Sequence, residues 1–201
     1  RLDRFIVEKA SDAEVLQTLA EAAAVAKIDA SDRPRLLAQL HAWIAQDAKI
    51  TPLKTLQGLI WAQGYSRGEL HGHIYADAVR ALERWRKAGL DIFVYSSGSI
   101  AAQQLIFGYS EAGDLRRLFS GFFDTTVGPK LARESYERIA KEIDVAPSDM
   151  VFFSDNALEL DAAASAGMQT VQLVRVQDHT VASPSHANAS SLENIDVEPA
   201  K

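Results

Sequence analysis

Hydrophobic residues recur at helical spacing through the first third of the chain. One apolar stripe follows a capping-box pattern at residues 11–14, and two more follow Pro34 and Pro52, a residue favoured in the first turn of a helix. These three stripes comprise Val15, Leu19 and Ala23, then Leu36, Leu37, Leu40 and Ile44, then Leu53, Leu56 and Ile60. Glycines at 64, 68 and 72 interrupt the pattern. We predict a helical unit over residues 1–70.

After residue 70 the pattern changes to short apolar runs that alternate with helical segments. The runs predict strands at residues 91–95, 150–153 and 170–174. The segments with helical spacing lie at residues 75–87, 130–143 and 158–166. Such alternation predicts a parallel sheet with both faces covered, so we expect residues 71–201 to form an α/β unit. The polar stretch from Gln177 onward predicts a loose tail with one short element near residues 192–195.

Composition narrows the class of protein. The 201 residues are 47% hydrophobic and 24% charged, which is typical of a folded globular chain. No run of about 18 apolar residues and no leader-like apolar start is present, so neither a membrane span nor secretion is predicted. A net charge of −6 without a basic run disfavours nucleic acid. The absence of cysteine fits a cytoplasmic protein.

Polar side chains follow two of the predicted strands, at the edge where ligands bind in open parallel sheets. Ser96 and Ser97 follow the first strand, and Asp155 follows the second. Helix capping is the alternative explanation, since Ser99 and Asn156 also stand where helices are expected to begin.

Lys130 adds a cation to this set. It follows Pro129, which predicts a place in the first turn of a helix. A cation there opposes the helix dipole at a cost of about 0.3–1 kcal/mol, whereas a bound anion reverses that effect. A solvated surface lysine remains the alternative. Together, hydroxyl groups, a lysine and a carboxylate predict a site for phosphate and Mg²⁺, which prefers oxygen ligands and substrate phosphate.

Four other polar residues have two open interpretations. His71 and His73 have a spacing seen in metal sites, but isolated histidines also form local hydrogen bonds. Glu159 and Asp161 follow Asp155 near a helix start, where they stabilise the helix dipole or support a metal ligand.

The three tryptophans (Trp43, Trp61 and Trp85) lie in helical patterns and are expected in cores.

Several of these segments resemble a known superfamily. Residues 94–99, 128–130 and 153–155, followed by Glu159 and Asp161, resemble the second, third and fourth motifs of the haloacid dehalogenase superfamily. Longer strings at residues 72–77, 105–115 and 119–126 resemble the enolase-phosphatases of methionine salvage, a family within it. The similarity is dense from about Pro52 to Val174.

The resemblance implies a Rossmann-like parallel core with an inserted helical cap. It further implies a Mg²⁺-dependent monomer that enolises a small phosphorylated diketone, 2,3-diketo-5-methylthiopentyl phosphate, and dephosphorylates it to an acireductone. By motif, Ser96 and Ser97 would bind phosphate, Lys130 would hold phosphate and balance its charge, and Asp155 would ligate Mg²⁺. Other capped phosphatases of the superfamily, and a phosphate-binding protein without turnover, remain alternatives.

One motif of the family is not found. Its first motif, a nucleophilic aspartate within Asp-x-Glu-Gly-Thr on a central strand, does not occur in this chain. We therefore expect a longer native protein, no phosphatase turnover from these 201 residues alone, and a missing first core strand. Because that strand would lie between them, its absence should leave residues 91–95 and 150–154 about 9–10 Å apart, without hydrogen bonds to each other.

Overall fold

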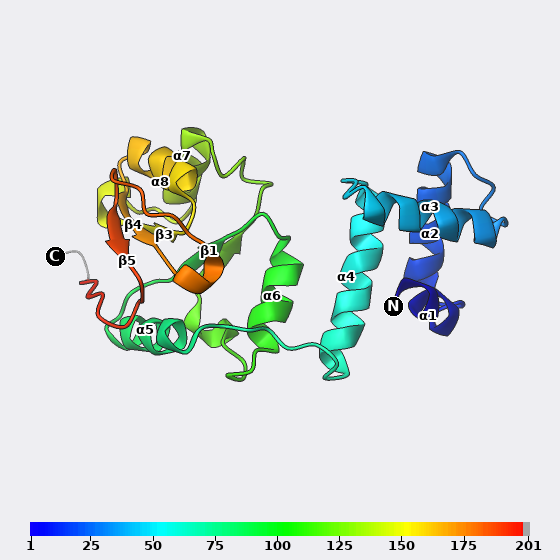
Figure 1. Cartoon of the computed structure of the whole chain (residues 1–201), viewed down its shortest axis with the longest axis horizontal. Coiled ribbons are helices and arrows are strands. Elements are labelled where there is room, and N and C mark those ends of the chain that lie inside the picture. Colours follow the sequence, from blue (N-terminus) through cyan, green and yellow to red (C-terminus); the bar gives the residue numbers. More distant parts are fainter. Residues whose placement is uncertain (199–201) are drawn as a thin grey trace. The chain divides into compact units, whose positions relative to one another are not determined.

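The computed structural model describes residues 1–198 and divides into two units, Arg1–His71 and the chain from Gly72 onward (Figure 1). The last three residues of the predicted second unit lie outside the described part. No helix in the described part has the length and apolar character needed to cross a bilayer. The role of the first unit as a cap stays a prediction.

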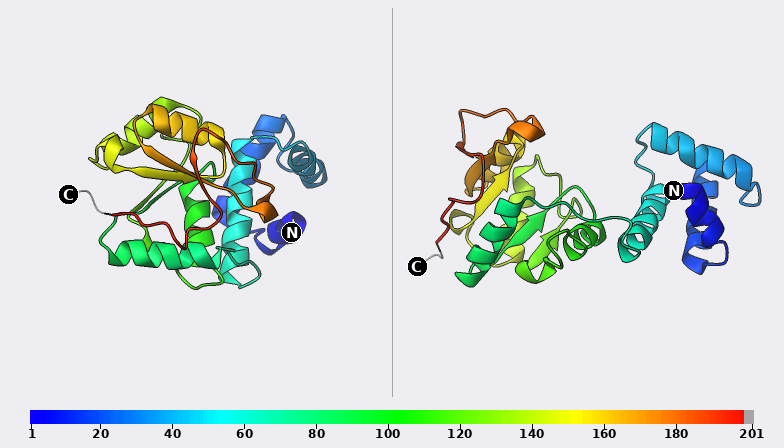
Figure 2. Two further views of the ribbon diagram at one scale, coloured as in Figure 1. Left: turned by 60° about the vertical axis from the view of Figure 1, so that its left-hand side comes forward. Right: turned by 60° about the horizontal axis from the view of Figure 1, so that its bottom comes forward.

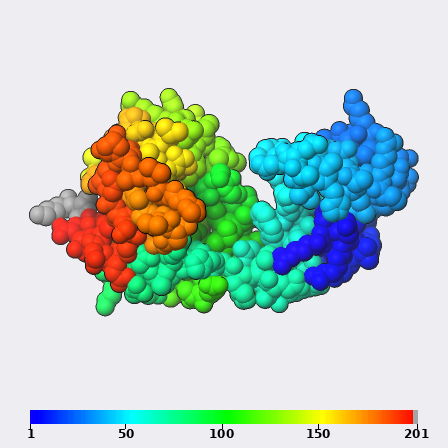
Figure 3. Space-filling view, viewed as in Figure 1, coloured from blue at the N-terminus to red at the C-terminus, as the bar shows by residue number. Residues whose placement is uncertain are grey.

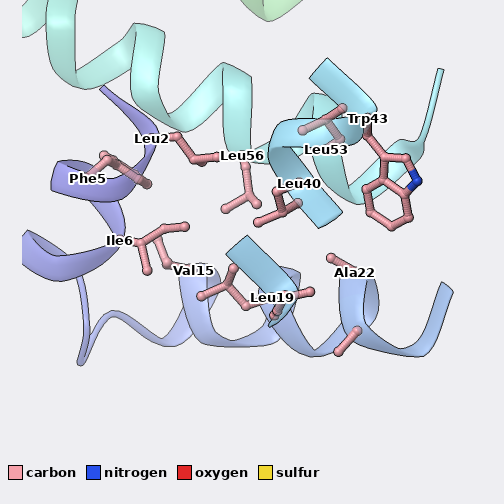
Figure 4. Close-up of a cluster of buried hydrophobic side chains, with 12 residues drawn as sticks. Leu2, Phe5, Ile6, Val15, Leu19, Ala22, Leu40, Trp43, Leu53 and Leu56 are labelled. Atoms are coloured by element: carbon pink, nitrogen blue, oxygen red, sulfur yellow. The ribbon is translucent and has the colours of Figure 1, made fainter. Parts of the chain in front are cut away.

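The first unit consists of helices, as predicted. Its helices are α1 (Leu2–Glu8), α2 (Ala13–Ala26), α3 (Arg33–Ala45) and α4 (Thr51–Ser66). Their apolar faces meet in one core, in which Val15, Leu19, Leu40 and Leu56 point toward one another (Figure 4). Each of these four side chains is at most 2% exposed. Burial of such leucine-sized groups stabilises a unit by about 1.5–3 kcal/mol per side chain.

Three details of this unit differ from the sequence prediction. Asp12, not Ser11, caps α2, since its carboxylate accepts the N–H groups of Glu14 and Val15 at 3.1 and 3.3 Å. Ile44 is 42% exposed and Trp43 is buried instead, because residue 43 continues the i, i+4, i+7 face of α3. Trp61 is also not a core residue, being 44% exposed.

The second unit alternates helices and strands, which confirms the α/β class. Along the chain it contains α5 (Ala76–Lys87), β1 (Phe93–Tyr95), α6 (Ile100–Gly108), β2 (Gly121–Phe123), α7 (Arg133–Glu142), β3 (Val151–Ser154), α8 (Ala157–Ser165), β4 (Gln169–Leu173) and β5 (Ala187–Ala189). The predicted strands and helices are all present, with shifted ends. Strand β2 was not predicted, because its three residues are too few to show a periodic pattern.

The strands form two parallel sheets rather than one. Strand β1 pairs with β2 in one sheet, and the other sheet has the order β3-β4-β5. Within residues 1–198, no ladder joins β1 to β3. The predicted lack of hydrogen bonds between these two strands is therefore confirmed, while the spacing of about 9–10 Å stays a prediction.

Helices cover both faces of the β3–β4 sheet. In Figures 1 and 2, α7 and α8 lie on one side of the strands and α5 lies on the other. Neighbouring residues of β3 follow this division, because side chains alternate across a strand. Phe152 packs on Tyr136 of α7 with ring centroids 5.1 Å apart, whereas Phe153 stacks on Trp85 of α5 at 5.3 Å.

The segment after residue 177 is not the loose tail that its polar composition predicted. Strand β5 pairs with β4 in parallel, and Leu192 is only 7% exposed. The carboxylate of Asp77 on α5 accepts the hydroxyl of Ser191 and the N–H of Leu192. Figure 3 shows this segment, coloured orange to red, as part of the surface of the second unit. Hydrogen bonds therefore hold a stretch that few apolar residues would anchor.

Candidate functional site

Lys130 does not lie in a helix, contrary to the sequence prediction. Helix α7 begins three residues later, at Arg133. The carbonyl groups of Pro129 and Lys130 instead accept the hydroxyl groups of Ser135 and Tyr136, each at 2.7 Å. These bonds hold the segment in a turn, so the argument from the helix dipole does not apply to this lysine.

The turn that carries Lys130 depends on Gly128. Its φ of +145° belongs to the region that L side chains rarely adopt. A Cβ atom at this position would lie 2.2 Å from the hydroxyl oxygen of Ser135. Only glycine therefore lets the chain pass close to α7 and present residue 130 to the site.

The ammonium group of Lys130 lies between the ends of β1 and β3. Its Nζ is 2.5 Å from a carboxylate oxygen of Glu159 and 5.8 Å from the ring centroid of Tyr95, the last residue of β1. Both members of the ion pair are mostly buried, with side chains 20% and 13% exposed. Electrostatic interactions are stronger in such a place than at an open surface.

Glu159 links this lysine to the end of β3. The same carboxylate oxygen accepts the hydroxyl of Ser154, the last residue of β3, at 2.9 Å. Asn156 caps α8 through the N–H of Leu158 at 3.0 Å, which confirms the predicted cap. Asp161 points elsewhere, to the ring of His186 at 3.0 Å.

The loop after β1 has a defined shape. Ser99 caps α6 through the N–H of Ala102, as predicted. The hydroxyl of Ser96 accepts the N–H of Gly98 at 3.1 Å, and the N–H of Ser96 donates to the carbonyl of Phe123. Ser97 is exposed. Capping thus explains Ser99, while Ser96 and Ser97 remain available to bind a ligand.

Asp155 lies directly after β3 with an exposed side chain. Its backbone carbonyl accepts the side-chain amide of buried Gln172 at 3.0 Å, which fixes the position of the residue. In residues 1–198, no group bonds its carboxylate and no cluster of three or more histidine, cysteine or acidic residues could hold a metal ion. Asp155 thus offers a carboxylate donor at the end of β3, which is part of the set that Mg²⁺ requires.

The two tyrosines beside Lys130 are donors rather than bases. Burial, together with the negative charge of Glu159, raises the pKa of Tyr95 and of Tyr136 above the ordinary phenol value. Their hydroxyl groups donate to the carbonyls of Gly128 and Lys130. Both remain protonated near neutral pH and hold the lysine turn against the sheets.

The two candidate histidines form no cluster in the described residues. The Nδ1 atom of His73 lies 3.1 Å from the carboxylate of Glu111, which is a local hydrogen bond. His71 and His73 also fall on either side of the boundary between the two units. The structure favours the local interpretation of His73.

Sequence reasoning did not identify two residues that hold the site. Gln103 on α6 donates to two carbonyls near the Ser96 loop. Asp124 follows β2 and accepts the N–H of Ile100 at 3.2 Å and the hydroxyl of Thr126 at 2.6 Å. These hydrogen bonds lower the pKa of Asp124, the bond from Thr126 most of all. Recognising β2 would have placed Asp124 at the same edge as Ser96 and Asp155.

Comparison with known protein families gives a consistent result. Residues 4–167 match the haloacid dehalogenase-like hydrolases. The chain is 54% identical over 174 residues to enolase-phosphatase E1 of Pseudomonas aeruginosa (strain LESB58), covering 87% of this chain and 77% of that protein. It is 48% identical over 175 residues to enolase-phosphatase E1 of Methylococcus capsulatus, with the same coverage.

Solved structures agree with this grouping. The crystal structure of UTR4 from Saccharomyces cerevisiae matches with a TM-score of 0.82 and 32% identity, covering 96% of this chain and 87% of that one. CbbY from Rhodobacter sphaeroides in complex with phosphate matches with a TM-score of 0.61, covering 92% and 89%. At 15% identity, the second match supports the fold alone.

Proposed function

The chain belongs to the haloacid dehalogenase-like hydrolases and, within them, to the enolase-phosphatase E1 family, and on this basis we propose that it acts in methionine salvage. The reaction is the conversion of 2,3-diketo-5-methylthiopentyl phosphate to an acireductone. It combines enolisation of the diketone with hydrolysis of the phosphate ester. The relatives' name supports both activities.

One observation carries the assignment to this site. The Lys130 ammonium stands between the last residue of β1 and the Glu159–Ser154 pair at the end of β3. An ammonium group so placed can donate a hydrogen bond to a phosphate that also contacts the Ser96–Ser97 loop. Phosphoryl transfer requires positioning and charge neutralisation above all. We assign phosphate binding to Ser96, Ser97 and Lys130.

Glu159 sets the charge balance of this arrangement. In the described structure its carboxylate neutralises Lys130, so binding of a phosphate dianion brings negative charge to a pair that is already neutral. The ammonium has three donors and can bond Glu159 and a phosphate oxygen together. Glu159 therefore orients the lysine rather than competing for it.

The proposed cofactor is Mg²⁺, with Asp155 as one ligand. A bound Mg²⁺ would polarise the phosphoryl and carbonyl oxygens of the substrate. The exposed, unpaired carboxylate of Asp155 fits this role in part, because Mg²⁺ binds through one or two carboxylates, waters and substrate phosphate. No second carboxylate among the described residues completes a cluster.

Turnover further requires a nucleophile. We propose that a strand carrying the family's Asp-x-Glu-Gly-Thr motif lies between β1 and β3, since these strands are unpaired with each other and both end at the site. Such a strand would satisfy the backbone groups on the facing edges of β1 and β3. Its aspartate would supply both the nucleophile and a second oxygen ligand.

The decisive experiment compares three proteins with Mg²⁺ and the phosphorylated diketone. These are the 201-residue chain, the chain extended by a strand with the Asp-x-Glu-Gly-Thr motif, and the same extension with Asn replacing the first Asp. Inorganic phosphate and the acireductone chromophore are measured together. We expect both products from the Asp extension only.

The other outcomes select between the alternatives. Release of phosphate from sugar phosphates, but not from the diketone, would assign the chain to another capped phosphatase. Phosphate binding without turnover in the Asp extension would indicate a ligand-binding protein. Turnover by the 201-residue chain itself would refute the proposed strand.

A further inference from the structure

Gln103 is a polar side chain buried beneath the loop that follows β1. It lies on α6 and is only 4% exposed. Its Nε2 donates to the carbonyl of Gly98 at 2.8 Å and to the carbonyl of Phe123 at 2.9 Å. One amide group therefore joins the Ser96–Ser99 loop to the end of β2.

The orientation of this amide is determined by its partners. Both neighbours are carbonyl oxygens, so the nitrogen must face them and use both of its protons. The Oε1 atom is consequently turned away, and no group in residues 1–198 bonds it. A buried acceptor without a partner costs free energy.

Because the unpaired Oε1 atom is unfavourable, the two hydrogen bonds from Nε2 must explain why a glutamine is buried at position 103. An apolar side chain of similar length would fill the same space without an unpaired oxygen. It would, however, remove the Gln103 donor from the carbonyl of Gly98 and one of the two donors from the carbonyl of Phe123. The buried glutamine is therefore explained by its effect on the backbone of the loop, and not by packing alone.

The bonds made by the loop show what Gln103 holds in place. Phe123 O accepts from both Gln103 and the N–H of Ser96, and Gly98 donates its N–H to the Ser96 hydroxyl. The hydrogen bond from Gln103 restrains the Gly98–Ser99 peptide, which carries that carbonyl. The conformation of the loop that carries Ser96 and Ser97 thus depends in part on a buried side chain of α6.

We propose that Gln103 is a positioning residue that holds the Ser96–Ser97 loop in its phosphate-binding conformation. The inference rests on the proposed role of this loop in binding phosphate. Without the amide, the loop samples other conformations, and the apparent affinity falls by the fraction of time spent in the competent one. Gln103 acts through the loop backbone and does not contact the reacting atoms.

The test uses inorganic phosphate as the probe and the 201-residue chain. Gln103→Met removes both donors at nearly constant volume, and Gln104→Met, at an exposed position of the same helix, is the matched control. Titration calorimetry gives the phosphate Kd, and NMR gives the exchange rates of the Ser96 and Gly98 amides. We expect Gln103→Met to raise the Kd and both exchange rates about tenfold. Gln104→Met should leave all three unchanged.

A second variant separates hydrogen bonding from packing. Gln103→Glu keeps the shape but presents a carboxylate to two carbonyl oxygens, which weakens phosphate binding at pH 8. Protonation at lower pH restores one donor, because a carboxylic acid has an O–H group. We therefore expect the ratio of the variant Kd to the wild-type Kd to fall as the pH is lowered from about 8 to about 5.5. A ratio independent of pH would overturn the proposal.

The two proposals fail in different ways. A folded Gln103→Met chain with wild-type amide exchange and phosphate affinity would refute the positioning role. A wild-type chain that does not bind phosphate, with faster exchange of Ser96 and Gly98 in the variant, would refute phosphate binding at this loop while retaining the structural effect of Gln103. If Gln103→Met does not fold, the pH series with Gln103→Glu decides the question.

Discussion

The Nζ atom of Lys130 and a carboxylate oxygen of Glu159 lie 2.5 Å apart, although the two residues belong to different segments of the second unit. The pair fixes the lysine at the edge where β1 and β3 both end. Removing one partner of a shielded pair leaves the other charge uncompensated. Substitution at either position therefore affects both ligand affinity and stability, and the two effects can be measured separately.

Lys130→Met should weaken phosphate binding by about 10–100-fold, since a hydrogen bond to a charged group contributes about 1.5–3 kcal/mol. Lys141→Met on α7 is the matched control, because Lys141 is exposed and away from the strand ends. Titration calorimetry with inorganic phosphate provides the measurement. Equal affinities in the two variants would remove Lys130 from the site.

Asp155→Asn should reduce phosphate release by the chain extended with the Asp-x-Glu-Gly-Thr strand by at least about 100-fold, because it removes a proposed Mg²⁺ ligand. Chelation of the metal with EDTA should reduce the wild-type rate to a similar level. Asp149→Asn, at the opposite end of β3, should remain within about twofold of wild type. Retention of Mg²⁺-dependent turnover in Asp155→Asn would exclude the proposed ligand.

Asp77→Asn should destabilise the second unit by about 3 kcal/mol near neutral pH. The Asp77 carboxylate is 13% exposed and pairs with Arg175 at 2.7 Å. Burial opposes its ionised form, but hydrogen bonds from Arg175, Leu192 and Ser191 outweigh burial and hold the pKa below its usual 3.8. Urea denaturation of wild type and variant gives the difference in free energy of unfolding.

The difference in free energy of unfolding between wild type and Asp77→Asn should depend on pH, and the direction follows from the lowered pKa of Asp77. A lowered pKa in the folded state stabilises the protein above the unfolded-state pKa and loses that effect as pH falls. The advantage of wild type over Asp77→Asn should therefore be full above about pH 5 and shrink below about pH 4. Glu193→Gln, in an exposed pair with Arg80, should have a much smaller effect on stability, because solvent screens that pair. A difference that grows with acidity would contradict this account.

Asp12→Ala should lower the stability of the helical unit by about 1 kcal/mol, whereas Ser11→Ala should have almost no effect. The carboxylate of Asp12 accepts two N–H groups of the first turn of α2, and the Ser11 side chain is not the cap. Thermal unfolding followed by circular dichroism distinguishes the two variants. An equal loss from Ser11→Ala would restore the capping box that the sequence suggested.

Helices and strands that are long enough to show a hydrophobic period could be predicted from the sequence. The helical stripes and the three apolar runs identified the α/β class because each buries a regular set of positions. Strand β2 was missed, since three residues carry no period, and its discovery places Asp124 beside the Ser96 loop. The capping roles of Ser99 and Asn156 followed from local chemistry alone.

Specific polar contacts, which local propensity does not reveal, set the limit of the prediction. Lys130 was expected in a helix because Pro129 favours a first turn, but Ser135 and Tyr136 bind the carbonyls that would start it. The polar segment after Gln177 was expected to be loose, yet the carboxylate of Asp77 binds Ser191 and Leu192 within it. The partners of the lysine turn lie six residues along the chain, and Asp77 lies 115 residues before Leu192. In both cases specific hydrogen bonds override local propensity.

The hydrogen bonds of the Asp77 carboxylate also affect folding during translation. The partners of this carboxylate lie 98, 114 and 115 residues further along the chain. The first unit and α5 leave the ribosome long before Ser191 and Leu192 have been synthesised. The face of α5 that carries Trp85 therefore stays exposed until Leu192 can pack against it. High contact order slows folding, and apolar surface left open during synthesis favours aggregation. Translation should therefore leave this face of α5 exposed until Ser191 and Leu192 emerge.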